Sequence, residues 1–378
     1  MTAASAETRT RRLADLRGRT DAMLASLEEL VNVESPSADL GATAACATTL
    51  AALGTALLGT PPERLEVDGR THLRWASGPT RVAVIGHFDT VWQLGTVARW
   101  PFSVDGGRAT GPGVFDMKGG VIQSLYALSR LDSLDGVCLL LTSDEELGSP
   151  TSRLLVEAAA RGARAALVTE PAARGGALKT GRKGVSMYTV RTHGIAAHAS
   201  DPSRGANASV ELARLVLEVE RLTDRGRGTT VTPTLLSGGA TQNTIPDRAW
   251  FYTDCRVVDV AEQQRVDAAM KALKASDPRV RVEVSGGPNR PPFPVSVGES
   301  LHRQAMRLTE EMGLGPVDGV AVAGGSDGNF TAAIGVPTLD GLGAVGDLAH
   351  GEGEYLEVGA MAERAALLAG LVEDLLEA

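Results

Sequence analysis

Cationic charge, cysteine and long apolar runs are all scarce in this sequence of 378 residues. Lys and Arg total 37 against 46 Asp and Glu, so the net charge of −9 provides no positive field for nucleic acid or anionic lipid. The three cysteines have no paired spacing, which favours reduced core residues over disulfides or a thiolate metal site. No apolar window approaches a membrane span and the N-terminus has no secretory core, so we expect a cytoplasmic protein without nucleic-acid or membrane partners.

Three short apolar runs, each ending in acids or histidine, predict buried strands. They are RVAVIGHFDT (81–90), GVCLLLTSDEE (136–146) and AALVTEP (165–171). Helix-like segments such as 119–131 separate them, and residues 9–31 and 42–58 also have helical spacing. This pattern is typical of an α/β fold with a mixed, mostly parallel sheet, in which ligand sites form at the C-terminal ends of the strands.

From Gly184 onward the order of the elements changes. The spacing predicts strands and helices in the order βαββαβ, at 184–194, 207–222, 229–237, 249–257, 260–273 and 280–286. This order predicts a split βαβ, ferredoxin-like domain. After the break GGPNRPPFP (286–294) the α/β sequence pattern resumes. We therefore expect a domain inserted at 183–289 between the two parts of a first domain, 1–182 and 290–378.

Acids and histidines gather after the predicted strands and in one later motif. They are His87 and Asp89 in GHFDT, Asp116 in GPGVFDMKGG, Asp144, Glu145 and Glu146 in the DEE triplet, Glu170 in TEP, and His350 in AHGEGEY. Each alone has an ordinary explanation as a turn or surface residue. Together, like-charged acids at one sheet edge would repel unless a cation neutralised them.

Carboxylates and imidazoles without cysteine suit zinc, cobalt or manganese in a hydrolytic site. Two ions fit this set of residues better than one. Asp116 could bridge them, with His87 and Glu170 on one ion and Glu146 and His350 on the other. The two ions would lower the pKa of a shared water so that it is a hydroxide near neutral pH.

Two acids are left without a metal. Asp89 lies two residues from His87 and could orient its imidazole as a hydrogen-bond acceptor. Glu145 is available as the general base.

These motifs resemble those of the di-zinc metallopeptidases that include glutamate carboxypeptidase, acetylornithine deacetylase, succinyl-diaminopimelate desuccinylase and aminoacylase. The series GHFDT, GPGVFDMKGG, TSDEELGS, TEP, GIAAHAS, GGSDGNF and HGEGEY follows the order of that family. The resemblance implies the same metal ligands and the same base, with two zinc ions per subunit. It also implies a cis peptide between Asp116 and Met117, and an inserted lid that forms a homodimer. Through that dimer His198 would donate to the oxyanion in the partner subunit's active site.

The resemblance also implies a set of substrate-binding residues. They are Asn243, Arg256, Arg290, Gly325 and Ser326. The motifs GGSDGNF (324–330) and NRPPF (289–293) are most similar to the glutamate carboxypeptidase branch, in which the arginine of the second motif binds a substrate carboxylate.

We therefore predict a zinc-dependent hydrolase that cleaves an amide bond adjacent to a free carboxylate of a small N-acyl amino acid or peptide. The alternative, with the same metal ligands and base, is an N-acyl amino acid deacylase. A catalytically inactive binding protein would be expected to lose Glu145 or a ligand, and all are present. A nucleotide-binding protein would need a glycine-rich turn after the first strand, which GHFDT does not provide.

Overall fold

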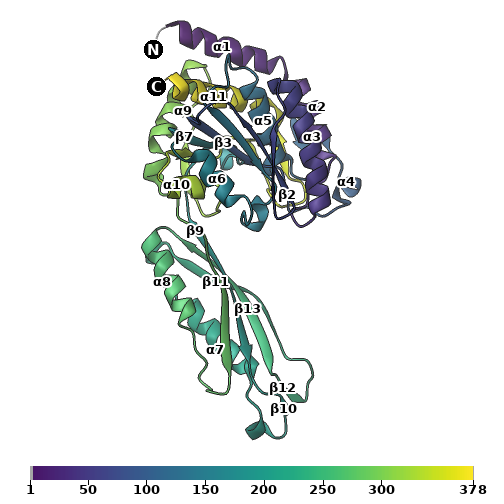
Figure 1. Cartoon of the computed structure of the whole chain (residues 1–378), viewed down its shortest axis with the longest axis vertical. Helices are drawn as coiled ribbons and strands as arrows, with labels where there is room; N and C mark the ends of the chain where they lie inside the picture. Colours follow the sequence, from purple (N-terminus) through teal and green to yellow (C-terminus); the bar gives the residue numbers. More distant parts are fainter. Residues whose placement is uncertain (1–2, 378) are drawn as a thin grey trace. The chain divides into compact units, whose positions relative to one another are not determined.

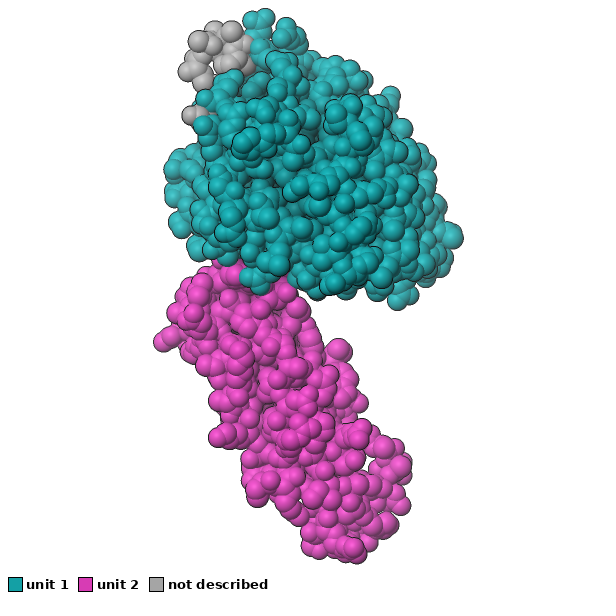
Figure 2. Space-filling model, in the orientation of Figure 1, with its two compact units in different colours: residues 1–181, 294–322, 326–378 teal, residues 182–293, 323–325 magenta. Residues whose placement is uncertain are grey.

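Two structural units divide the chain, of which the computed structural model describes residues 3–377. Unit 1 comprises Met1–Gly181, Pro294–Val322 and Ser326–Ala378, and unit 2 comprises Arg182–Phe293 with Ala323–Gly325 (Figure 2). Unit 2 is thus slightly longer than the predicted insert. It also includes a short return segment, because the Arg182 guanidinium donates hydrogen bonds to the carbonyls of Gly324 and Gly325.

Unit 1 is built on a mixed six-stranded sheet with the order β1-β2-β6-β3-β7-β16 (Figure 1). The strands are β1 (Glu63–Val67), β2 (Arg70–Ala76), β3 (Val82–His87), β6 (Val137–Thr142), β7 (Ala165–Val168) and β16 (Thr338–Leu339). The three predicted strands β3, β6 and β7 are parallel neighbours at the centre, with β16 parallel to β7. The prediction of an α/β fold with a mixed sheet is therefore confirmed.

The β1–β2 hairpin was not predicted, and it pairs antiparallel with β6. Its turn residues Asp68 and Gly69 both have positive φ, 48° and 78°. An Asp-Gly pair between alternating strands is a strong hairpin signal, so the sequence did contain the information.

Helices cover both faces of this sheet. They are α1 (Ala3–Arg17), α2 (Thr20–Val31), α3 (Leu40–Leu58), α4 (Thr96–Arg99), α5 (Gly119–Leu128), α6 (Arg153–Ala160), α9 (Glu299–Glu311), α10 (Gly328–Ala333) and α11 (Val358–Glu377). Alternate residues of β3 enter two different cores: Val82 and Val84 pack with α5 and α11, whereas Ala83 and Ile85 pack with α6 and α10. A fully buried β3 explains why its sequence is continuously apolar instead of alternating.

Smaller strands complete unit 1. A four-stranded sheet has the order β17 (Gly346–Asp347), β18 (Tyr355–Glu357), β5 (Arg108–Thr110) and β4 (Ser103–Asp105), and β8 (Leu178–Arg182) pairs with β15 (Gly319–Val322). The first of these sheets carries two of the loops that form the site described below.

Two expectations about the N-terminal helices are corrected. The helical pattern of 9–31 forms two helices instead of one, because the chain turns at Gly18 and Arg19. In addition, α3 is long and apolar enough to span a membrane by length and composition, with a mean hydropathy of 1.5, contrary to the expectation that no segment would be. One face of α3, including Cys46 and Leu50, is buried in the core of unit 1.

Unit 2 has the predicted βαββαβ order, and its strands form an antiparallel sheet β11-β13-β9-β14. The elements are β9 (Gly184–His193), α7 (Ala208–Glu220), β11 (Thr230–Gly238), β13 (Arg248–Val257), α8 (Val260–Lys271) and β14 (Arg281–Arg290). Residues from both helices and the inner face of the sheet make a separate apolar core. A small two-stranded antiparallel sheet of β10 (Ala197–His198) and β12 (Thr244–Ile245) extends the end at which β9 finishes and β13 starts.

One glycine allows α5 to begin close to the end of β7. A Cβ on Gly120 would lie 2.0 Å from the carbonyl oxygen of Thr169, which precedes Glu170. Gly359 has the same place in α11, as its second residue, but a Cβ there would meet nothing within 4 Å.

We expect Gly120→Ala to lower the free energy of unfolding by about 1–3 kcal/mol, because the new methyl group would displace the Thr169 backbone. Gly359→Ala is the matched control, and it should leave that free energy unchanged or raise it by up to about 1 kcal/mol. Urea unfolding followed by circular dichroism measures both. Equal effects of the two substitutions would contradict the packing argument.

Candidate metal centre

The predicted acids and histidines of unit 1 come together beyond the ends of its parallel strands. His87 is the last residue of β3, and Glu170 follows the end of β7 by two residues. Glu145 and Glu146 begin a short 3₁₀ turn just after β6. Because β6, β3 and β7 are adjacent and parallel, their C-terminal ends meet at one edge of the sheet.

Asp116 lies at the centre of this cluster, with its two carboxylate oxygens facing different histidines. Oδ1 is 3.4 Å from His87 Nε2, which is also 3.5 Å from an oxygen of Glu170. Oδ2 is 3.4 Å from His350 Nε2, which is 2.9 Å from an oxygen of Glu146. The structure thus brings all five predicted ligands together, in two groups that share Asp116.

Two buried atoms at the centre have no hydrogen-bond partner among the described residues: His87 Nε2 and Asp116 Oδ1. A buried polar atom without a partner is costly, so these two atoms fit a site where a cation would contact both. Nitrogen and carboxylate oxygen donors without sulfur suit zinc and related divalent ions. The donor set therefore fits a metal site.

The electrostatics of the cluster favour positive charge. Burial lowers the pKa of His87, but the carboxylates of Asp116, Asp89 and Glu170 outweigh it and raise that pKa well above its usual value. The carboxylates of Asp116 and Glu146 raise the pKa of His350 to about 11. Carboxylates that stabilise positive charge on both imidazoles provide the field that a cation site needs.

Asp89 differs in detail from its predicted role. His87 Nδ1 lies 3.0 Å from the backbone carbonyl of Asp89 and 3.4 Å from its carboxylate. The fully buried carboxylate instead accepts hydrogen bonds from the Ser37 hydroxyl and from the backbone N–H groups of Glu145 and Glu146. Asp89 therefore connects the end of β3 to the acidic turn after β6.

Glu145 is 9% exposed and lies beside the first ligand group. Atoms of Glu145, His87 and Glu170 fall within 4.8 Å of one another. This proximity is what a base acting on a water between the ligands requires, and it also makes Glu145 a possible ligand. Metal analysis of variants separates the two roles.

Two further buried ionisable side chains, which the sequence did not predict as functional, fix the segment around Asp116: Lys118 lies within it, and Glu354 contacts it from a distant part of the chain. The Lys118 ammonium donates hydrogen bonds to the carbonyls of Leu30 and Val33. Glu354 accepts hydrogen bonds from the Asp116 segment, and burial raises its pKa to about 7. Both stand in motifs that were noticed, but their partners are distant in sequence. The Asp116–Met117 peptide is cis, as the resemblance implied.

In unit 2 the predicted substrate residues are divided between its two ends. His198 is exposed, with Nδ1 2.7 Å from the Ser200 hydroxyl, and Asn243 is beside it because Ala199 donates to its carbonyl. Arg256 and Arg290 are at the other end, since both align with Val185 on β9.

The separation limits which of the predicted substrate-binding residues of one chain can act on the same group of a substrate. From Arg248 to Arg256, β13 extends about 27 Å at about 3.4 Å per residue. Asn243 precedes β13, so Asn243 and Arg256 of one chain cannot hold the same carboxylate. Arg256 already forms a two-point ion pair with Asp254, at 2.7 and 2.8 Å. The Arg290 side chain is buried and packs where a Cβ on Gly325 would lie.

Ser326 does not present its hydroxyl to a substrate. It is fully buried, and its Oγ donates to Asp340 at 2.6 Å while accepting from the backbone of Gly328 at 3.0 Å. The side chain therefore stabilises the start of α10, and only the backbone of Ser326 is left for a binding role.

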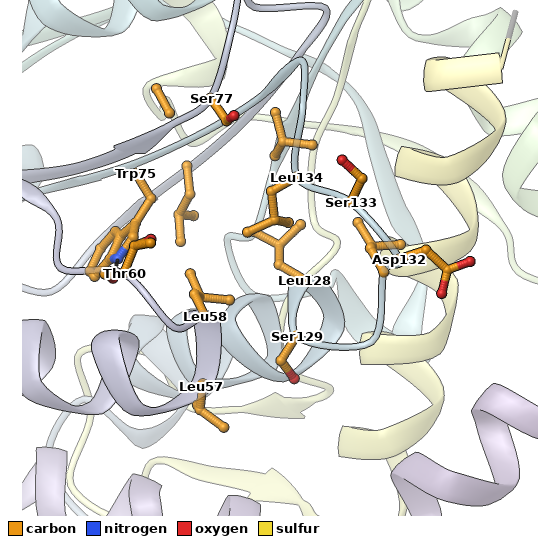
Figure 3. A pocket seen from close by; sticks show the side chains of 14 residues that line it. Leu57, Leu58, Thr60, Trp75, Ser77, Leu128, Ser129, Asp132, Ser133 and Leu134 are labelled. Atoms are coloured by element: carbon orange, nitrogen blue, oxygen red, sulfur yellow. Dashed lines mark hydrogen bonds between the residues drawn. The ribbon is translucent and has the colours of Figure 1, made fainter.

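A pocket of about 350 Å³ with both polar and apolar lining residues lies elsewhere in unit 1 and is not this site (Figure 3). Trp75, Leu128 and Leu134 line it, together with Val137 at the start of β6. The metal cluster lies beyond the opposite end of β6. In an α/β sheet the ligand end is the C-terminal one, which supports assigning function to the cluster.

An α/β sheet with histidines and carboxylates converging at its strand ends, and an inserted βαββαβ unit, define a metal-dependent hydrolase. Residues 83–374 match the model of peptidase family M20/M25/M40, so the chain belongs to this family. It is 32% identical to carboxypeptidase G2 of Pseudomonas sp. (strain RS-16), over 94% of this chain and 89% of that protein. It is also 32% identical to succinyl-diaminopimelate desuccinylase of Paracoccus denitrificans, over 76% and 82%.

Solved structures share the fold. An M20 family metallo-carboxypeptidase from Sulfolobus solfataricus superposes with a TM-score of 0.75 at 16% identity, covering 93% of this chain and 98% of that one. A tripeptidase from Staphylococcus aureus gives 0.72 at 18% identity, covering 95% and 99%. The predicted family and the prediction of an amide-cleaving metalloenzyme are confirmed.

Glu145 and Glu146 are neighbours with different expected roles. We expect Glu145→Gln to keep its metal content and to lose turnover by ~10²-fold or more, because it removes a general base. Glu146→Gln should lose about one metal ion per chain, because Glu146 is the carboxylate next to His350. Elemental analysis of the purified variants measures metal, and initial rates measure turnover. Loss of metal from Glu145→Gln alone would show that Glu145 is a ligand.

Proposed function

We propose that the protein is a di-zinc carboxypeptidase-type hydrolase that cleaves an amide bond adjacent to a free carboxylate. The observation that carries this proposal is Asp116, whose two oxygens face two separate histidine-carboxylate groups. Each group offers three ligand residues when Asp116 is shared, which is the number that catalytic zinc sites use while keeping a position open. Cobalt or manganese would fit the same donors.

The roles of the residues follow from their places. His87 and Glu170 would hold one ion, and Glu146 and His350 the other, with Asp116 between them. When bound, the ions would polarise the amide carbonyl and lower the pKa of a water molecule. Glu145 would accept a proton from the attacking water and deliver it to the nitrogen of the leaving amine. Asp89 holds the backbone of Glu145 through an N–H hydrogen bond of 3.2 Å.

We assign recognition of the substrate's free carboxylate to Arg290. Arg290 is buried in unit 2, and its guanidinium could form the paired hydrogen bonds that a carboxylate accepts. The similarity to carboxypeptidase G2 over most of both chains supports a carboxypeptidase. The similarity to a desuccinylase supports the second candidate, an N-acyl amino acid deacylase. Three free, buried cysteines support a cytoplasmic location.

A hydrolysis screen tests the reaction and its selectivity. We expect the zinc-loaded protein to cleave one or more N-acyl amino acids or dipeptides, and chelation of the metal to abolish cleavage. A C-terminal amide of the best substrate should lower kcat/KM by about 30-fold or more, because a buried arginine would lose its partner, at about 2 kcal/mol. Arg290→Ala should remove that preference and keep the metal content. Equal rates for acid and amide would contradict the carboxylate clamp.

Unit 2 also supports a homodimer. Its edge strand β11 exposes Leu235 (59%) and Leu236 (66%), and α7 exposes Leu217 (60%). An exposed apolar edge of a sheet is a surface that a second chain can cover. We propose that the dimer brings His198 and Asn243 of one chain to the partner's metal centre, which would explain their separation from Arg256 and Arg290.

Mixing two inactive variants tests the exchange of His198. Glu145→Gln and His198→Ala should each have little activity alone. After unfolding and refolding together, mixed dimers should recover activity, because one of their two sites has Glu145 and receives an intact His198 from the other chain. Refolding each variant by itself is the control. No recovery in a mixture shown to contain mixed dimers would place His198 in its own chain's site.

A further inference from the structure

Glu354 is a fully buried carboxylate that accepts four N–H hydrogen bonds. Its Oε1 accepts from the backbone of Phe115 and of Asp116, both at 2.8 Å. Its Oε2 accepts from the backbone of Gly113 at 3.1 Å and from the Trp92 indole at 3.0 Å. Three of the four donors belong to the turn that carries the shared ligand Asp116.

This turn cannot satisfy its own N–H groups. Asp116 (φ −114°, ψ 98°) and Met117 (φ −131°, ψ 34°) are not helical, and Gly113 has a φ of 76°. Buried backbone N–H groups need partners, and Glu354 is the partner that the structure provides for the three in this turn. A carboxylate accepts several such bonds at once, and charge-assisted bonds are stronger than neutral ones.

Strand pairing explains how Glu354 reaches the turn. In the small sheet, β18 pairs with β5, with Tyr355 opposite Thr110. The turn follows β5, whereas Glu354 directly precedes β18 and comes four residues after His350. The same pairing therefore aligns the segments that carry Asp116 and His350.

We infer that Glu354 is a positioning residue of the metal centre. Its carboxylate fixes the backbone of the 113–116 turn so that the oxygens of Asp116 face His87 and His350. It acts through Asp116 and touches no reacting atom. The inference rests on the proposed function, because it assigns Glu354 a role in holding the ions.

The test compares Glu354→Gln with Glu352→Gln. Glutamine keeps the shape of Glu354 but replaces one acceptor oxygen with an NH₂ group, which would face N–H donors. Glu352 is in the same loop and exposed, so its substitution removes the same charge without touching the turn. Measurements are zinc affinity by competition with a chelator, and amide hydrogen exchange of residues 113–116 in the metal-free protein.

We expect Glu354→Gln to weaken zinc binding by about 10- to 100-fold, the usual effect of losing a partner that orients a ligand. Exchange at Gly113, Phe115 and Asp116 should become faster, and Glu352→Gln should match wild type in both measurements. Trp92→Phe removes only the indole donor, so it serves if Glu354→Gln does not fold. It should accelerate exchange at Gly113 by about 2- to 10-fold, corresponding to one hydrogen bond.

Two negative results have different meanings. Wild-type zinc affinity in a folded Glu354→Gln protein, or unchanged exchange at Gly113 in Trp92→Phe, would overturn the inference alone. A wild-type protein that binds no zinc would instead overturn the proposed function. In that case the exchange rates still report whether Glu354 holds the turn.

Discussion

The candidate metal centre of unit 1 depends on one electrostatic constraint. Several carboxylates lie at one edge of a sheet, and positive charge must offset their mutual repulsion. Asp116, Glu146 and Glu170 lie close to two imidazoles, and the Asp116 carboxylate is shared between them. Like charges at this distance are tolerated only where positive charge compensates them. The nearby carboxylates raise the pKa values of His87 and His350. Among the described residues, His87 Nε2 and Asp116 Oδ1 have no hydrogen-bond partner, which fits a cation between them.

Around this centre, a set of buried charges holds backbone instead of substrate. Asp89 accepts hydrogen bonds from the N–H groups of Glu145 and Glu146, and Glu354 accepts from the Asp116 turn. Lys118 donates to the carbonyls of Leu30 in the last turn of α2 and of Val33 just after it. Asp89 and Glu354 are thereby bonded to the backbone of the predicted base or of predicted ligands, and Lys118 itself follows the predicted ligand Asp116 by two residues. Such partners fix ligand geometry before any ion binds, which is the condition for a well-ordered metal site.

Unit 2 places the residues to which we assign substrate recognition at its two ends. Arg256 and Arg290 lie at the end of the sheet where β13 finishes, and His198 and Asn243 lie by the β10–β12 pair at the other end. A rigid antiparallel sheet keeps these pairs apart within one chain. That distance is the physical argument behind the proposed homodimer, in which a second chain would supply the pair that the first cannot.

The sequence by itself determined the parallel strands, the βαββαβ insert and all five residues of the cluster, since continuous apolar runs and acids at strand ends are local patterns. Local signals for the break at Gly18 and for the hairpin at Asp68 are also present in the sequence. The partners of Glu354 and Lys118 depended on tertiary structure, because these buried charges take their partners from segments distant along the chain. The separation of Asn243 from Arg256 was likewise decided by sheet geometry. A sequence motif identifies a residue, but only the strand pairing determines its position in space.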